Sequence, residues 1–294
     1  MKGKKILVFS IFLLFSTTLF SQELTHKWTS LLTPDGRYFD VFIGIPHKSL
    51  AALPGWDKGD GMNTGTALGL NNDSLHVFTI EMVDGQPILH ISGEIFGGYS
   101  TKKEYGNYHL RVEFKWGEKK YNPKLGLKRD NGILYHGKEP HGQFWHVWLR
   151  APEFQVEEGN MGDMYFLAGM GSDVHSRQKD STNQRSGWIY DPQAPLHPFA
   201  SWGAPAGAVS HLKGDFEKPN GEWNILELYC YGDKAVHVVN GHVALVTEHL
   251  HTLATDSTAA SALSNGHIQL QSEGAEAFYR NIRIKKLDKM PDFK

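Results

Sequence analysis

The sequence is nearly free of cysteine. Cys230 is the single cysteine in 294 residues, so no disulfide can form within the chain. It lies in the apolar run 225–231, which is typical of a strand, and we expect a buried structural thiol rather than a nucleophile. A chain without disulfides depends on the size of its hydrophobic core for stability.

A surplus of positive charge is also missing. The chain has 30 Lys and Arg residues against 32 Asp and Glu residues, which gives a formal net charge of −2. Nucleic acids and anionic membranes are bound by basic surfaces. Neither is therefore expected as a partner.

Long apolar runs are absent beyond the N-terminus. Residues 6–20 form an apolar stretch after Lys2, Lys4 and Lys5, and a cleavage point follows between Ser21 and Gln22. The stretch is shorter than a transmembrane helix requires. We predict a signal peptide at 1–21, one domain at 22–294, no transmembrane segment in the mature chain, and a secreted or periplasmic location.

No segment has a long apolar period of 3.6 residues, and short strands separated by turns take its place. In the clearest strand, residues 108–116, apolar side chains alternate with His109, Arg111, Glu113 and Lys115. The pattern predicts an all-β sandwich or barrel. Residues 170–220 are rich in Gly, Ser and Pro, and we expect a structured loop that covers one face.

Familiar catalytic motifs are missing as well. The chain has no G-x-S-x-G elbow, no phosphate-binding glycine loop and no H-E-x-x-H. The spacing of His136, His141 and His146 matches no standard zinc motif. No cofactor or metal ligand is therefore predicted, while a divalent cation such as Ca²⁺ on loop oxygens stays open.

The run 153–157 alternates polar and apolar residues. A strand would place Glu153, Gln155 and Glu157 on one face, with Phe154 and Val156 on the other. Carboxylates and an amide accept hydrogen bonds from sugar hydroxyls, and nearby tryptophans stack on sugar rings. The run therefore favours a sugar site, although a solvated strand face remains an alternative.

Five stretches resemble the 3-keto-disaccharide hydrolase domain family, in the same order along the chain. Residues 98–114 resemble its T-x-x-x-Y-G-x-F-x-L-x-x-E-F motif, and 152–156 resemble its P-E-V-Q-I motif. The other stretches are 130–133, 221–224 with 239–241, and 266–271 with 278–285. The family is abundant in secreted proteins of Bacteroidetes, and the resemblance implies a concanavalin A-like jelly-roll β-sandwich of two antiparallel sheets.

The resemblance also implies cleavage of the glycosidic bond of 3-keto-glycosides. A ketone at C3 acidifies the C2 proton, so a base can remove this proton and the C1 substituent can leave. We assign Glu153 as the general acid/base and His136 as a second candidate base, and expect Arg280, Arg111 or Lys115 to stabilise the enolate. The predicted substrate-binding residues are Arg111, Glu113, Lys115, Asn131, Trp148 and Gln155.

Purely structural roles remain alternatives for three of these residues. His136 can be a hydrogen-bonded loop residue, Arg280 a structural ion pair, and Trp148 a core residue. A lectin-like glycan-binding module is the first alternative function. An ordinary β-glucanase is the second, but Gln155 stands at the centre of the strand motif where those enzymes have a carboxylate.

Overall fold

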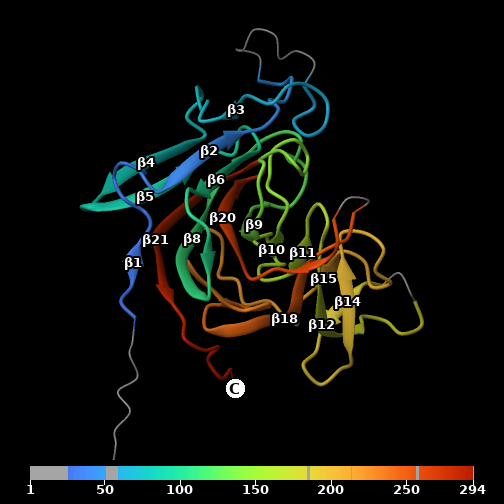
Figure 1. Ribbon diagram of the computed structural model, residues 1–294. Coiled ribbons are helices and arrows are strands. Elements are labelled where there is room, and N and C mark those ends of the chain that lie inside the picture. Colours follow the sequence, from blue (N-terminus) through green and yellow to red (C-terminus); the bar gives the residue numbers. More distant parts are fainter. Residues whose placement is uncertain (1–25, 51–58, 184–185, 213, 256–257, 294) are drawn as a thin grey trace, which may run out of the picture.

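The computed structural model describes residues 26–50, 59–183, 186–212, 214–255 and 258–293. The predicted signal peptide lies outside these residues. All regular structure in the described residues is β-structure (Figure 1). None of the described residues belongs to a helix long and apolar enough to cross a membrane.

The strands form two antiparallel sheets. The larger sheet has the order β13 (Trp188–Tyr190), β12 (Met170–Gln178), β18 (His242–Thr252), β17 (Lys234–Val239), β16 (Asn224–Tyr231), β8 (Tyr108–Lys120), β21 (Ala275–Lys286), β5 (Gln86–Ile91) and β4 (Phe78–Val83). Three short strands add to it: β1 (Thr29–Ser30) on β21, β14 (Leu196–Ala200) on β12, and β19 (Ser261–Ala262) on β18.

The smaller sheet carries the strands that matter most for the cavity described below. Its order is β15 (Val209–Ser210), β11 (Met164–Phe166), β10 (Pro152–Gln155), β9 (Gly132–Gly137), β20 (Asn265–Ser272), β6 (Gly97–Thr101), β2 (Phe39–Ile43) and β3 (Gly69–Leu70), with β7 (Tyr105–Gly106) paired to β20.

The main hydrophobic core lies between the two sheets. The apolar side chains of β8, including Val112 and Phe114, are fully buried there, and Phe154 and Val156 meet them from the smaller sheet. Alternation along each strand then turns the polar side chains outward. The structure confirms the predicted all-β, concanavalin A-like jelly-roll sandwich of two antiparallel sheets.

The prediction of a loop over residues 170–220 is wrong, because the segment contains four strands, β12 to β15 (Figure 1). β12 is held between β18 and β14 by main-chain pairing. Its inward side chains include Ser172 and Ser176, which are fully buried, and Ser172 hydrogen-bonds Thr247. Small polar residues take the place of apolar ones on the buried face, so the sequence shows no hydrophobic period.

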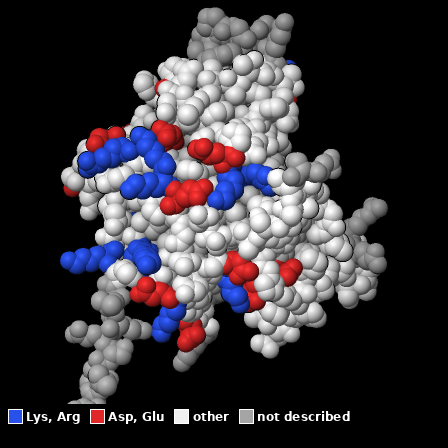
Figure 2. All heavy atoms as spheres, in the orientation of Figure 1, with Lys and Arg blue, Asp and Glu red and all other residues white. Residues whose placement is uncertain are grey.

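The face of the molecule in Figure 2 carries charged groups of both signs. Figure 2 shows Lys and Arg side chains interspersed with Asp and Glu over the face that it presents. This mixed distribution agrees with the near-neutral composition.

Candidate active site

A cavity of about 820 Å³ lies on the face of the smaller sheet that points away from the core. Phe154 is fully buried in the core, so its neighbours Glu153 and Gln155 project from the opposite face of β10 into the cavity. The volume lies within the range of small-molecule binding sites. The alternation predicted for this strand therefore agrees with the structure, although β10 ends at Gln155 and Glu157 follows in a turn.

Three adjacent strands build what we call the polar floor of the cavity. Gln155 on β10 lies opposite Gly132 on β9, and Gln271 of β20 reaches the same place from the other side. A Cβ atom on Gly132 would lie 2.1 Å from Glu153 Oε1 and 2.3 Å from Gln271 Oε1. The missing side chain therefore lets a carboxyl group and an amide approach each other above the sheet.

A buried cation joins the polar floor. Lys124 Nζ donates to Asp130 Oδ2 at 2.5 Å and lies 2.7 Å from Glu273 Oε1. Burial alone would lower the pKa of Lys124, but Glu273 and Asp130 outweigh it and raise this pKa above its usual value. Burial raises the pKa of Asp130 and of Glu273, each of which also feels the other cavity carboxyl groups.

Glu153 has the most unusual environment of these groups. It is 4 % exposed, and its Oε1 has no hydrogen-bond partner among the described residues. Burial, followed by the nearby Glu273 and Asp130 carboxyl groups, raises its pKa well above the ordinary value. A carboxyl group held this way binds its proton tightly and is a strong base once ionised.

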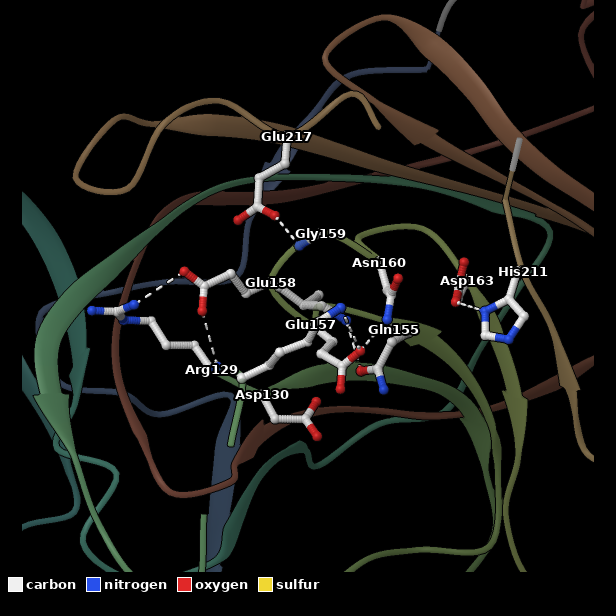
Figure 3. A network of polar contacts seen from close by, with 12 residues as sticks. Arg129, Asp130, Gln155, Glu157, Glu158, Gly159, Asn160, Asp163, His211 and Glu217 are labelled. Atoms are coloured by element: carbon white, nitrogen blue, oxygen red, sulfur yellow. Dashed lines mark hydrogen bonds and ion pairs between the residues drawn. The ribbon is translucent and has the colours of Figure 1, made fainter. Parts of the chain in front are cut away.

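Glu157 completes the carboxyl groups around the cavity. Figure 3 shows Asp130, Gln155 and Glu157 close together, with the Asn160 amide directed at the Glu157 carboxylate. Lys128 Nζ lies 3.8 Å from the same carboxylate. Asn160 and Lys128 therefore hold Glu157 at the rim of the cavity.

Aromatic side chains line the rest of the cavity, which we call the aromatic wall. Trp145 lies 4.8 Å from Phe144 and 5.5 Å from Trp148, measured between ring centroids. Trp148 is 1 % exposed and donates its indole N–H to the Gly97 carbonyl, so it supports Trp145 from below. The other members of the wall are Tyr165, Leu167, Ala168, Trp202 and Ala208.

Two predicted residues lie on the core side of the smaller sheet. His136 is fully buried, its ring packs against Tyr108 and Tyr135, and burial lowers its pKa to about 4. Asn131 is also buried and accepts a hydrogen bond from Tyr279 at 2.9 Å. Asn131 alternates with Gly132, and His136 turns toward the core at an irregularity of β9, where its φ is 49° and the register with β20 shifts, so neither residue faces the cavity.

The remaining four predicted residues lie on the outer face of the larger sheet, with the core between them and the cavity. They are Arg111, Glu113, Lys115 and Arg280. Arg280 Nε donates to Glu113 at 2.8 Å, and its guanidinium lies 4.0 Å from the ring centre of Trp223. Packed sheets are about 10 Å apart, so the sandwich excludes a single site that holds all nine predicted residues.

Sequence reasoning missed most of the polar floor and of the aromatic wall. Those residues are Lys124, Asp130, Trp145, Tyr165, Trp202, Gln271 and Glu273. Gln271 stands within a family-like stretch, which is the one signal that pointed to it. The three histidines considered for a metal lie in different surroundings, and the described residues include no cluster of His, Cys, Asp and Glu arranged to hold a metal ion.

The family of this chain makes it a carbohydrate-active, glycosyl hydrolase-like domain. The chain belongs to the family described as the 3-keto-alpha-glucoside-1,2-lyase-like domain, which matches residues 48–285. This match confirms the resemblance found in the sequence. No curated protein matches the chain.

Solved structures similar to this chain include two candidate glycosyl hydrolases from Parabacteroides distasonis. The first has 15 % identity and a TM-score of 0.46, and the alignment covers 89 % of this chain and 100 % of that one. The second has 18 % identity and a TM-score of 0.43, with coverage of 77 % and 87 %. LamAcat from Zobellia galactanivorans has 10 % identity and a TM-score of 0.43, with coverage of 90 % and 98 %.

Proposed function

We propose that this protein cleaves the glycosidic bond of 3-keto-glycosides in the cavity above the smaller sheet. The observation that carries the proposal is Glu153, a buried carboxyl group that faces the cavity with Oε1 unpaired among the described residues. Family membership supports the same substrate class. The signal peptide predicted at 1–21 supports a periplasmic or secreted location.

Glu153 acts as the general acid/base. Its ionised carboxylate takes the proton from C2, and the electron pair of the broken C2–H bond forms the C1–C2 double bond. The bond between C1 and the glycosidic oxygen breaks. Glu153 donates the proton that it took from C2 to this oxygen, which leaves as an alcohol. Water then adds to the unsaturated ketone, so that the whole reaction is hydrolysis.

Lys124 stabilises the charge that develops on the C3 oxygen. Two of its three N–H protons are directed at Asp130 and Glu273, which leaves the third for the enolate. This role replaces the one predicted for Arg280, which lies on the other sheet. Because Asp130 and Glu273 fix the ammonium group before the substrate arrives, little reorganisation is needed during the reaction.

Gln155 and Gln271 bind the sugar hydroxyl groups. Both side chains line the cavity, and Gln271 Oε1 has no hydrogen-bond partner among the described residues. A buried acceptor without a donor is costly, so a hydroxyl group of the sugar gains by supplying that donor.

The test is turnover of a chromogenic 3-keto-glucoside beside its unoxidised parent, with and without EDTA. We expect the purified protein to cleave the keto form alone. If it cleaves neither compound but binds unmodified glycans on an array, the protein is a glycan-binding module. The amides of Gln155 and Gln271 on the polar floor, which can bind sugar hydroxyl groups without cleaving the sugar, are the observation that favours this second function.

A further inference from the structure

We propose that the aromatic wall is an aglycone subsite, and that the substrate is a 3-keto-glycoside with an apolar or aromatic aglycone rather than a second sugar. This inference rests on the proposed function, since it names the group that lies beside the 3-keto-sugar. It is carried by the division of the cavity into two chemically different halves.

The charged groups of the cavity all belong to the polar floor or its rim. They are Lys124, Asp130, Glu153, Glu157 and Glu273. The aromatic wall comes from other parts of the chain: the turn around Trp145, the strand β11 with the residues after it, and the segment around Trp202. The cavity of about 820 Å³ leaves space beside one sugar ring on the floor.

Two polar side chains on the wall already bond the main chain. Ser201 Oγ donates to the Phe166 carbonyl and accepts from the main-chain N–H groups of Gly169 and Met170. Gln143 directs its amide nitrogen at two main-chain carbonyl groups. A second sugar would have only the Gln143 carbonyl oxygen, the Tyr165 hydroxyl and the indole N–H groups of Trp145 and Trp202 as side-chain partners, and burying its remaining hydroxyl groups unpaired is unfavourable.

Trp202 is the main apolar contact that the wall offers. It is 56 % exposed although it lines the cavity, and its ring packs on Gly169. Large exposed aromatic side chains in a concave site bind planar or apolar groups. A ring of the aglycone would cover the exposed face of Trp202.

Glu153 lies at the boundary between the two halves. It is directly opposite Tyr165 in the pairing of β10 with β11, and the wall continues from Tyr165 to Leu167 and Ala168. The acid/base must reach the bond between sugar and aglycone. With the sugar on the polar floor, the leaving group at that bond projects onto the aromatic wall.

The test compares binding of 2-phenylethyl glucoside, methyl glucoside and a glucosyl-glucose by calorimetry. These unoxidised ligands have alcohol leaving groups of similar chemistry, and product analysis in the same sample shows whether any is cleaved. We expect 2-phenylethyl glucoside to bind about tenfold more tightly than methyl glucoside. We expect the disaccharide to bind no more tightly than methyl glucoside.

Trp202→Ala should reduce the preference for the phenylethyl group to within about twofold, and Trp202→Phe should keep most of it. Trp223→Ala is the matched control, because Trp223 lies on the outer face of the larger sheet. Equal binding of the three ligands, or tighter binding of the disaccharide, overturns the inference.

Turnover of methyl 3-keto-glucoside, measured separately, tests the proposed function. Trp223→Ala should leave this turnover unchanged, since Trp223 lies on the outer face of the larger sheet. Loss of all turnover together with a retained phenylethyl preference would reject the proposed function and support the subsite. Turnover of methyl 3-keto-glucoside without a preference for the phenylethyl group would support the proposed function and reject the subsite.

Discussion

Gly132→Ala tests the geometry of the polar floor with a single methyl group. The new Cβ would lie 2.1 Å from Glu153 Oε1, so the carboxyl group must retreat by about 1 Å to reach an ordinary contact distance. The backbone of Gly132 is not in the left-handed region, so alanine adds no conformational strain. A displacement of about 1 Å in a reacting group costs about 100-fold in rate.

The assay is kcat/KM on a 3-keto-glucoside, with the melting temperature measured in parallel. We expect a loss of about 100-fold in kcat/KM, and a loss of stability of about 1–3 kcal/mol from overpacking. Gly126→Ala is the matched control. Gly126 is exposed, and a Cβ atom there would meet no described atom within 4 Å.

Activity within twofold of the wild type in a folded Gly132→Ala protein would refute the reasoning. That result would mean that the position of the Glu153 carboxyl group does not limit the reaction. A similar loss in the Gly126→Ala protein would instead place the effect outside the polar floor.

Three further predictions follow from the same geometry. Lys124→Met should destabilise the protein by about 3 kcal/mol at pH 7, because it leaves Asp130 and Glu273 buried without their cation. Because the pKa values of both carboxyl groups are raised, both groups take up protons as the pH falls, so urea unfolding should show that the loss shrinks toward acid pH; a loss that does not change with pH would argue against the pairing. Because Glu153 reacts as the ionised base, kcat/KM should rise with pH through its raised pKa, with a midpoint well above 4.5, and a falling profile would assign it as an acid alone. Arg280→Met should keep kcat/KM within about twofold, since Arg280 pairs with Glu113 on the other sheet, and a tenfold loss would place the site there.

The sequence was sufficient for the fold and for one strand of the site. The alternation along 108–116 and 153–157 predicts burial well, because most side chains that pack in the core of these strands are apolar. It placed Phe154 in the core and Glu153 on the opposite face, as the structure has them.

Alternation does not say which outer face a polar side chain occupies. Arg111 and Glu153 both follow the pattern of a half-buried strand, yet they lie on opposite sides of the sandwich. Both sheets have polar outer faces, so the pattern alone cannot separate them. This is why Arg280 and Glu153 were grouped in one predicted site.

The polar floor depends on contacts between distant parts of the chain. Lys124 meets Glu273 because β8 pairs with β21, which sets Lys120 opposite Ala275. The pairing of these strands is not encoded in any local pattern, so the ammonium group was not predicted. Trp202 was not predicted as a site residue, because the segment 170–220 was expected to be a loop and its place beside the cavity depends on contacts between distant parts of the chain.

The most direct measurement compares wild-type protein and Glu153→Gln on a 3-keto-glucoside and on its unoxidised parent. We predict that the wild type cleaves the keto form alone, and that Glu153→Gln folds normally but loses at least about 100-fold in kcat/KM. Full activity of Glu153→Gln on the keto form, or equal cleavage of both compounds by the wild type, would contradict the account.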